Sequence, residues 1–298
     1  MPFFIGLDIG GTKTAGGVFG DNGNPVAQSV VPTPGSYEEL VAACGKLFSE
    51  FEKICGEAAK IGIGIAGMID QTQGTVFAPN IPYLAGKPFR QDLEKLANHH
   101  VHIANDADCA ALSEAIDGAG QGHRLVFGLV MGTGVGGGMV IDGKLYQGTH
   151  GMAGEIGHVP LPFREASDGP VVACGCGQKG CLDKTISGPA LARLYKVMTG
   201  KEADAAHVGE LAQGGDAEAR RVLDQFYTTV AKACTVIFHT FDPEVIVING
   251  GLNDLPGIYD EVPRRWGQYC LAKSPRTKLL PAKFGSMSGL RGAAWLGI

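Results

Sequence analysis

The chain has 298 residues, of which 45% are hydrophobic, and it carries a formal net charge of −5 with a pI near 5.9. This length is enough to bury a full core and favours two domains over one. No cluster of Lys and Arg offsets the acidic balance, which argues against nucleic-acid binding, and the lack of a long apolar run argues against a membrane span.

The first third of the chain alternates between strand and helix patterns. Residues 3–9 and 14–20 predict two strands joined by a glycine turn, and a third strand is predicted near 26–31. Ser36 and Glu39 have the spacing of a capping box and open a helix that runs to about Cys55. A strand at 61–65, a helix near 87–98, a strand at 101–104 and a helix from about 106 to 117 follow. The start lacks the basic region of a signal peptide, so we expect a cytoplasmic protein.

The turn between the first two strands is a candidate phosphate site. It contains Asp8, Gly10, Gly11, Thr12 and Lys13. Glycines let backbone N–H groups approach phosphate oxygens, the Thr12 hydroxyl and Lys13 ammonium can bind them, and Asp8 can hold hydrated Mg²⁺. The spacing is neither that of a Walker A loop nor that of a dinucleotide fingerprint. An ordinary hairpin with Gly-Gly at its turn is the alternative.

Asn105 and Asp106 lie where a short predicted strand gives way to a helix. The position suits an N-cap, because a carboxylate is stabilised at a helix N-terminus. It also suits a general base that accepts a proton from a substrate hydroxyl as the hydroxyl attacks a γ-phosphate. Both interpretations remain open at this point.

Two groups of polar residues near this position are predicted to lie on the surface without a chemical role. The acidic group is the exposed side of the helix that follows, Asp108, Glu114 and Asp117. The second group is a solvated histidine cluster without a carboxylate or thiol partner, His99, His100 and His102.

The second half repeats the glycine turn. Residues 126–131 and 135–141 predict a strand pair, and Asp142-Gly143 predicts a hairpin turn after it. The turn within the pair is Gly132, Thr133, Gly134, Val135, Gly136, Gly137 and Gly138. Together with the first turn it can hold a polyphosphate from both sides. A buried strand at 245–248 leads to Gly250 and Gly251, which offer a flat surface for a base or ribose, or a simple strand-to-helix turn.

One histidine and three thiols have the separations of a metal site: His158, Cys174, Cys176 and Cys181. Such a Cys₃His set usually binds tetrahedral Zn²⁺. A redox pair, a tight turn or a folding staple without a substrate role are the alternatives. Glu155 lies three residues before the histidine, which gives the same segment a possible contact with substrate. The other cysteines are scattered through helical patterns as small buried hydrophobes, and this usage fits a reducing compartment.

The remaining pattern completes a duplicated fold. Helical sequence dominates from 187 to 241, and a final helix is predicted near 289–296. An apolar stripe at helical spacing marks the side that faces the core: Leu223, Phe226, Val230, Ala233, Ile237 and Phe241. Two glycine-turned strand pairs, each leading a mixed sheet, predict an α/β fold with two lobes and a cleft between them. We expect a small lobe at 1–117 and a large lobe at 118–285.

These motifs together resemble the ROK family of bacterial sugar kinases, within the actin-like ATPase superfamily that has a ribonuclease H-like fold. The likeness spans essentially the whole chain and rests on five motifs in the family's order, at Asp8, at Asn105-Asp106, and in the segments 132–138, 154–158 and 174–181. It implies an ATP-dependent kinase that uses Mg²⁺, carries a structural Zn²⁺ and commonly forms a homodimer. It also implies that the C-terminal helix, about 286–298, returns to the N-terminal lobe.

The resemblance also implies roles for single residues. Asp106 would be the catalytic base, and the expected sugar ligands are Asn105, Asp106, Glu155 and His158. Gly67 and Asn80 match positions that line the sugar pocket in relatives. His158, Cys174, Cys176 and Cys181 match the structural zinc ligands, so that His158 would serve metal and sugar through opposite ring nitrogens.

The preferred sugar is indicated by smaller features. The segments 86–90 and 112–115 add a likeness to members that phosphorylate the 6-hydroxyl of N-acetylglucosamine, with glucokinases and fructokinases as alternatives. Asp183 stands where the family usually has a glutamate that binds the sugar near its anomeric end, and it is one methylene shorter. Tyr83, in place of a tryptophan found in fructose-selective members, favours an acetamido sugar. The family's sugar-sensing regulators are a less favoured alternative, because they carry an additional N-terminal DNA-binding segment.

Overall fold

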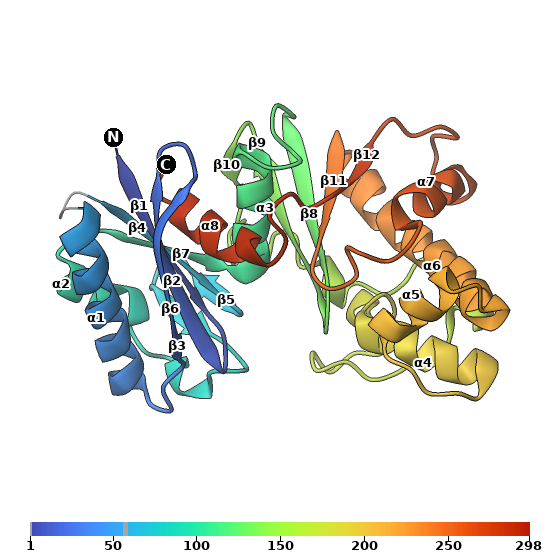
Figure 1. Cartoon of the computed structure of the whole chain (residues 1–298), viewed down its shortest axis with the longest axis horizontal. Coiled ribbons are helices and arrows are strands. Elements are labelled where there is room, and N and C mark those ends of the chain that lie inside the picture. Colours follow the sequence, from blue (N-terminus) through green and yellow to red (C-terminus); the bar gives the residue numbers. More distant parts are fainter. Residues whose placement is uncertain (1, 56–58) are drawn as a thin grey trace. The chain divides into compact units, whose positions relative to one another are not determined.

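A computed structural model describes residues 2–55 and 59–298, which fall into two compact units (Figure 1). Unit 1 comprises Met1–Gly122, Gly138–Ala153 and Ser286–Ile298. Unit 2 comprises His123–Gly137 and Gly154–Gly285. The sequence places residues 138–153 in the second lobe, whereas the structure assigns them to unit 1. The backbone at Gly138 lies close against Asp108 and Ala111. A Cβ at this position would be 2.8 Å from Asp108 Cα and Ala111 Cβ, so only glycine allows this approach.

Unit 1 is built on a five-stranded sheet of order β3-β2-β1-β4-β7. Its strands are β1 (Phe3–Ile9), β2 (Lys13–Gly20), β3 (Pro25–Pro32), β4 (Lys60–Ile65) and β7 (Val101–Asn105). The first three strands pair antiparallel, and β1, β4 and β7 are parallel. Parallel strands covered on both faces favour continuous apolar runs, and β4 is buried from its second residue to its last. All five strands predicted in this part of the sequence are therefore present.

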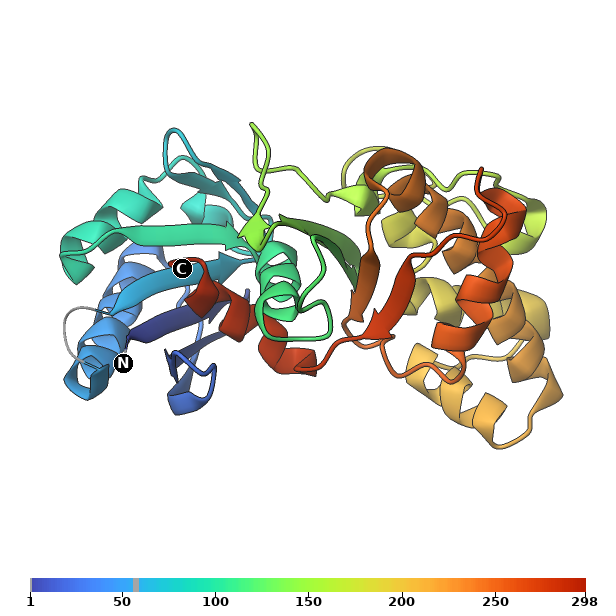
Figure 2. The same cartoon turned by 90° about the horizontal axis from the view of Figure 1, so that it is seen from above.

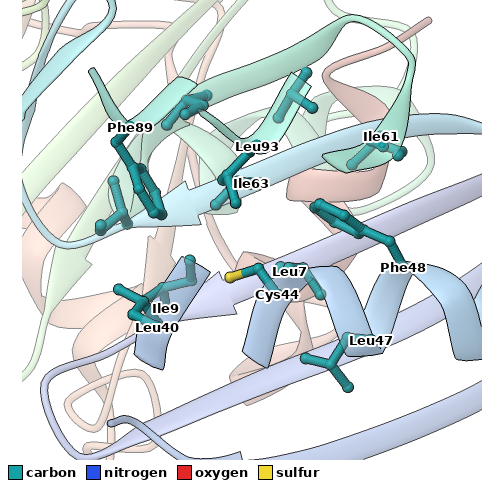
Figure 3. Close-up of a cluster of buried hydrophobic side chains, with 14 of the residues drawn as sticks. Leu7, Ile9, Leu40, Cys44, Leu47, Phe48, Ile61, Ile63, Phe89 and Leu93 are labelled. Atoms are coloured by element: carbon teal, nitrogen blue, oxygen red, sulfur yellow. The ribbon is translucent and has the colours of Figure 1, made fainter. Parts of the chain in front are cut away.

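One face of this sheet is covered by α1 (Tyr37–Cys55) and α2 (Phe89–Ala97). Apolar side chains from both helices meet β1 and β4 in the core, as Figure 3 shows for Leu40 and Phe48 of α1, Leu93 of α2, and Leu7 and Ile63 of the sheet. A small hairpin, β5 (Met68–Asp70) and β6 (Thr75–Phe77), precedes α2. The core thus fixes the sheet whose strand ends carry the candidate site.

The other face is covered by α3 (Asp106–Ile116) and α8 (Ser288–Trp295), which lie side by side (Figure 2). Glycines permit the backbone of α8 to approach both the sheet and α3. A Cβ would lie 1.9 Å from the Ala293 oxygen at Gly62 and 1.6 Å from the Cys109 oxygen at Gly292. Real Cβ atoms do not come so close to backbone oxygens, so only glycine fits at these two positions.

The prediction that Asp108 and Glu114 lie on an exposed helix face is wrong. Asp108 is buried, and Glu114 is fully buried where α8 covers α3. Glu114 accepts hydrogen bonds from Ser288 Oγ and the Ala119 N–H, both at 2.9 Å. Asp117, also predicted on the exposed face, is partly buried and forms an ion pair with Arg291. The acidic side of α3 is therefore a polar seam beneath the C-terminal helix.

Unit 2 contains the parallel strands β8 (Leu125–Met131), β11 (Val245–Asn249) and β12 (Lys278–Pro281). The whole second sheet has the order β10-β9-β8-β11-β12, with β9 (Val135–Ile141) and β10 (Lys144–Leu145). The helical sequence predicted from 187 to 241 forms three helices: α4 (Gly188–Thr199), α5 (Ala205–Gln213) and α6 (Ala217–Phe241). Two further elements, β12 and α7 (Ile258–Tyr269), were not predicted from the sequence. Among the described helices, none has the length and apolar character needed to cross a membrane.

Candidate active site

In unit 1 the first glycine turn closes between β1 and β2. The Gly10 N–H donates to the Lys13 oxygen at 2.9 Å, and Thr33 Oγ1 donates to the Gly10 oxygen at 2.7 Å. Gly11, Thr12 and Lys13 are exposed. A Cβ at Gly11 would lie 3.1 Å from the Asn80 oxygen, so the turn and Asn80 are neighbours. The turn is thus tied down at its base and open at its tip, as phosphate binding requires.

Asp8 ends up in an environment that disfavours its charge. Burial and the nearby Asp106 carboxylate raise the pKa of Asp8 from 3.8 to about 6, against the opposing effect of Lys13. The start of α8 also reaches this carboxylate, since a Cβ at Gly289 would lie 3.3 Å from Asp8 Oδ2. Two carboxylates and one ammonium from separate elements therefore share this end of the sheet. A divalent cation would relieve the repulsion between the two carboxylates.

We expect Asp8→Asn to stabilise the protein at neutral pH when nucleotide and divalent metal are absent. A raised native pKa means that the native state binds more protons than the unfolded state between about pH 4 and 6. Stability is consequently lost as pH rises through this window, and an amide avoids the loss. A shift of this size corresponds to at most about 3 kcal/mol, and we expect about 1–2 kcal/mol after relaxation. Urea unfolding at pH 7.5 and pH 4 measures it, and the gain should vanish at pH 4. Asp21→Asn on an exposed turn is the matched control, and a loss of stability at pH 7.5 in Asp8→Asn would contradict the account.

Asn105 and Asp106 join β7 to α3, and the structure gives the capping role to the first of them. Asn105 is the N-cap, because its Oδ1 accepts from the Ala107 N–H at 2.8 Å, and its Nδ2 donates to the Gly67 oxygen at 3.0 Å. Asp106 follows with more than a third of its surface exposed. Burial nevertheless raises the pKa of Asp106, against the backbone N–H of Ala107 that donates to it at 2.9 Å. Its carboxylate is thus available and more basic than an ordinary aspartate.

The other residues expected at the sugar pocket of unit 1 lie close by. Gly67 is fixed by its neighbours, since a Cβ there would meet the Phe77 oxygen at 2.5 Å. Asn80 is exposed beside Gly11. Tyr83 packs against the core of the unit, and its hydroxyl donates to the Pro34 oxygen. Unit 1 therefore brings Gly67, Asn80, Asn105, Asp106 and the phosphate turn to one end of its sheet.

In unit 2 the second glycine turn and Gly250-Gly251 are neighbours. The Gly132 N–H donates to the Gly134 oxygen at 2.9 Å, and the Gly188 N–H donates to the Gly132 oxygen at 2.8 Å. Gly250 has a φ of 88°, and a Cβ there would lie 2.6 Å from the Met131 oxygen. These contacts keep side chains away from both segments. The result is a stretch of bare backbone at the ends of β8 and β11, which suits a nucleotide.

Two glycines of the predicted phosphate run have a different reason to be glycine. A Cβ at Gly137 would lie 2.8 Å from the Gly154 oxygen and from the Phe127 ring. Gly138 packs against α3 in the same way. Both lie within β9, beyond the turn itself. Close packing therefore explains the second half of the run, and the turn at Gly132, Thr133 and Gly134 is the part that can reach phosphate.

The predicted metal ligands do come together. Donor atoms of His158, Cys174, Cys176 and Cys181 all lie within 4.8 Å of one another. His158 Nδ1 is 3.6 Å from Cys174 Sγ, and the Cys176 and Cys181 sulfurs are 3.7 Å apart. Tetrahedral bonds of about 2.3 Å to sulfur and about 2.0 Å to nitrogen separate neighbouring donors by about 3.5–3.8 Å. The donor set therefore fits a tetrahedral metal ion.

His158 connects this cluster to Glu155. Its Nε2 lies 4.0 Å from Glu155 Oε2, on the opposite side of the ring from Cys174. Both residues belong to the segment around the 3₁₀ helix Ile156–His158. This segment packs closely against Val135, since a Cβ at Gly157 would lie 1.9 Å from the Val135 oxygen. The metal set thus orients a histidine whose other nitrogen faces a carboxylate.

Asp183 is engaged by the protein itself. Its Oδ1 accepts from the Val135 N–H at 3.0 Å, and its Oδ2 pairs with Lys184 Nζ at 2.8 Å and lies 3.9 Å from Cys174 Sγ. Asp183 thereby connects the second glycine turn with the metal cluster. The spacing of the motifs in the sequence contains no signal for this contact, because the residues are 48 positions apart.

A buried lysine anchors the loop before the metal cluster. Lys232 of α6 is fully buried, and its Nζ donates to Asp168 at 2.9 Å and to Glu165 at 2.8 Å. Thr229 Oγ1 donates to the same Asp168 at 2.9 Å. The apolar stripe predicted on this helix gave no indication of a charged residue in the core. Removing either partner of such a pair leaves a buried charge, so the anchor holds the loop firmly.

Comparisons with known proteins cover the whole chain. The model of the ROK family matches residues 4–298. The N-acetyl-D-glucosamine kinase of Vibrio parahaemolyticus is 40% identical over 300 residues, which are 99% of each chain. Among solved structures, a ROK hexokinase from Thermus thermophilus has a TM-score of 0.86 at 35% identity and covers 99% of this chain and 97% of its own. A ROK family glucokinase from Streptomyces griseus, solved with glucose and AMPPNP, has a TM-score of 0.78 at 32% identity and covers 99% of both chains.

Proposed function

Because this chain belongs to the ROK family, we propose that it transfers the γ-phosphoryl group of ATP to the 6-hydroxyl of N-acetyl-D-glucosamine. The observation that carries the proposal is the full-length identity of 37–40% to N-acetyl-D-glucosamine kinases. The geometry of unit 1 supports it, since a base and a phosphate turn lie at one end of the same sheet. The fold is that of the two-lobed actin-like ATPases that these sugar kinases share.

The chemistry follows from the groups at the end of the unit 1 sheet. Asp106 orients the sugar hydroxyl and accepts its proton as the oxygen attacks the γ-phosphorus and the bond to ADP breaks. Lys13 and the N–H groups of the turn stabilise the charge on the phosphate oxygens. Mg²⁺, held by Asp8, would supply further neutralisation of that charge. The raised pKa of Asp106 makes it a better proton acceptor than an ordinary aspartate.

Unit 2 carries the other residues to which we assign roles. We infer that the bare backbone at Gly132–Gly134 and Gly250-Gly251 receives ATP, and that Glu155 and the Nε2 side of His158 bind sugar hydroxyls. The four-residue cluster would hold structural Zn²⁺, with Nδ1 of His158 as its nitrogen ligand. His158 would then be fixed through Nδ1 with its other nitrogen toward the substrate, so that metal and sugar would share one side chain.

The sugar preference depends on Asp183 in this proposal. Its Oδ1 accepts from the Val135 N–H and its Oδ2 pairs with Lys184, and each oxygen keeps a lone pair for a sugar hydroxyl or for a bridging water. Selectivity then rests on this contact together with those to the acetamido group and the remaining hydroxyls.

A coupled assay of ADP release tests the proposed function. We expect N-acetylglucosamine to give the highest kcat/KM in a panel with glucose, N-acetylmannosamine, mannose and fructose. A higher value for glucose would replace the substrate with that of the related glucokinases. No turnover with any hexose, from zinc-loaded protein with ATP and Mg²⁺, would disprove kinase activity.

Cys176→Ser is expected to lose the metal and destabilise unit 2. Zinc content, measured by atomic emission, should fall from about one ion per chain to near zero, because a thiolate is replaced by a weak hydroxyl ligand. The midpoint of urea unfolding should fall with it. Cys55→Ser, a change outside the cluster, should keep both values near wild type. Wild-type protein that contains no zinc after purification without chelators would contradict the assignment.

The family resemblance also leads us to propose a homodimer in the cytoplasm. Light scattering coupled to size-exclusion chromatography would measure the mass in solution, and a single species near 31 kDa would contradict the dimer.

A further inference from the structure

Unit 1 contains a cavity of about 210 Å³ away from the phosphate turn. It is lined by β7, α3 and α8 together with the hairpin at β10. Leu112, Ile116 and Trp295 form part of an apolar wall. Its polar lining comes from six side chains: Gln71, Arg90, His100, His102, Lys144 and Gln147. A water needs only about 10–15 Å³ of such space, so the cavity has room for a small organic molecule.

The side chains that line this cavity are positive or neutral. Four of them are basic or imidazole groups, and no side chain among the described lining residues is acidic. The negative groups beside them are the terminal carboxylate of Ile298 and Glu94, which pairs with His100. The whole chain, in contrast, carries a net charge of −5. Burial lowers the pKa of His102, and His100, Lys60 and Arg90 lower it further, against Glu94. The positive charges of Lys60 and Arg90 thus lie near His102, and a bound anion would be attracted to them.

The histidine cluster predicted as solvated and without a carboxylate partner differs in the structure. His100 remains exposed, but its Nδ1 lies 2.6 Å from Glu94 Oε1. His102 is half-buried, with its ring centroid 4.5 Å from that of His100. Glu94 is itself fixed, because its Oε1 also accepts a hydrogen bond from the Val101 N–H at 3.2 Å. The imidazoles are thus fixed at the cavity rim instead of moving freely in solvent.

Arg90 is held in place at the cavity by hydrogen bonds to Gln71. Its Nη2 donates to the Gln71 backbone oxygen at 3.0 Å, and its Nη1 donates to Gln71 Oε1 at 3.3 Å. Gln71 is held in turn, because its Nε2 donates to the Ile103 oxygen at 3.0 Å. A guanidinium has five N–H donors in a fixed plane, so Arg90 retains donors for a ligand. Lys144 is exposed on the opposite hairpin and adds a flexible charge.

We propose that this cavity binds a small phosphate monoester, with the phosphate held by Arg90, Lys144 and the two imidazoles and the organic part against the apolar wall. Charge-assisted bonds from a planar guanidinium suit phosphate oxygens. The cavity is lined by the same strand and helices that position the candidate active site. His102 and Ile103 precede Asn105 on β7, Leu112 lies on the helix that Asp106 begins, and α8 reaches Asp8 at its other end. We therefore expect occupancy of the cavity to change the affinity for sugar.

Isothermal titration with glycerol 3-phosphate tests the binding. The protein is first saturated with N-acetylglucosamine and AMPPNP, which keeps the probe out of the candidate active site. We expect one saturable site per chain, a weaker affinity at high salt, and a Kd at least about tenfold higher in Lys144→Gln and Arg90→Gln. Lys46→Gln, which removes an exposed charge on α1, is the matched control and should leave the Kd unchanged.

Three outcomes would overturn the binding proposal. These are the absence of saturation up to about 10 mM probe, an affinity that neither substitution lowers, and an affinity for inorganic phosphate equal to that for the ester. Lys144 is exposed, so its variant keeps the test valid if Arg90→Gln fails to fold. Because the readout is binding, the result does not depend on whether the chain phosphorylates any sugar.

The effect on sugar affinity rests on the proposed function and has its own measurement. The Kd for N-acetylglucosamine is compared with and without saturating glycerol 3-phosphate, in wild type and in Lys144→Gln. We expect a change in wild type of about fivefold or more that is lost in the variant. A Kd that the ester leaves unchanged would refute the coupling alone. No binding of N-acetylglucosamine under either condition would instead refute the proposed function.

Discussion

Asp106→Asn is expected to lower kcat by about 10³-fold while the protein remains folded and binds sugar. The amide has the shape of the carboxylate and can still receive the Ala107 N–H at its oxygen, so the start of α3 should be retained. It cannot accept the proton of the 6-hydroxyl as that oxygen attacks. Binding uses hydrogen bonds that an amide can replace, whereas the chemical step needs the base, so the loss should appear in kcat much more than in KM.

Calorimetry and kinetics together separate these effects. The Kd for N-acetylglucosamine, the zinc content and the urea midpoint of Asp106→Asn should all stay close to wild type. The Asp21→Asn control should retain full turnover. A near-normal rate in Asp106→Asn would remove the base assignment. A loss of sugar binding as large as the loss of rate would make Asp106 a ligand without a role as base.

The pH profile of the wild-type enzyme provides a second view of the same group. Burial raises the pKa of Asp106, so the acid limb of kcat/KM should lie above the ordinary aspartate range. Activity should fall as pH drops through that raised value, because the protonated form cannot act as base. The Asp8 carboxylate lies near Asp106 and interacts with it, so the acid limb reports the titration of the two carboxylates together. Asp106→Asn should remove the Asp106 contribution and flatten the residual profile.

Local sequence patterns were sufficient for most elements of unit 1. The apolar runs of β1 and β4 and the capping spacing at Ser36 act within a few residues, and each predicts its element directly. The metal set is similar, because the short spacing of Cys174, Cys176 and Cys181 restricts the loop so strongly that geometry follows from it. These signals depend on neighbours in the chain, which a single sequence records.

Contacts between distant segments could not be predicted in the same way. Glu114 is polar and lies on a helix with other acids, which is the ordinary pattern of an exposed face. It is buried because α8 covers α3, and Ser288 of that helix, 174 residues later, donates to it. Asp183 bonds to Val135 and Lys232 to Asp168 over separations of 48 and 64 residues. Each of these polar groups has a partner that periodicity cannot reveal, since the pairing exists only after the sheets and helices have assembled.

The docking of α8 is the point at which a small change should have the largest effect on stability. Gly292→Ala is expected to destabilise unit 1 by about 4 kcal/mol or more, with most of the protein unfolded or insoluble at 37 °C. The added methyl would lie 1.6 Å from the Cys109 oxygen, and backbone on both sides prevents relief by a rotamer change. The helix must move away from α3, and the buried contacts of Leu290 and Trp295 weaken with it.

The consequence for function follows from the other end of the same helix. If α8 moves, Gly289 leaves its place beside Asp8, and the Ser288 hydroxyl no longer donates to Glu114. Any folded fraction of Gly292→Ala should therefore turn over more slowly than wild type even at low temperature.

Gly62→Ala tests the packing of α8 from the side of the sheet, where the methyl would lie 1.9 Å from the Ala293 oxygen. Gly35→Ala is the control, because a Cβ there has no neighbour within 4 Å, and it should change the free energy of unfolding by less than about 1 kcal/mol. If Gly292→Ala unfolds at the same urea concentration as Gly35→Ala, the close contact between α8 and α3 does not exist in solution.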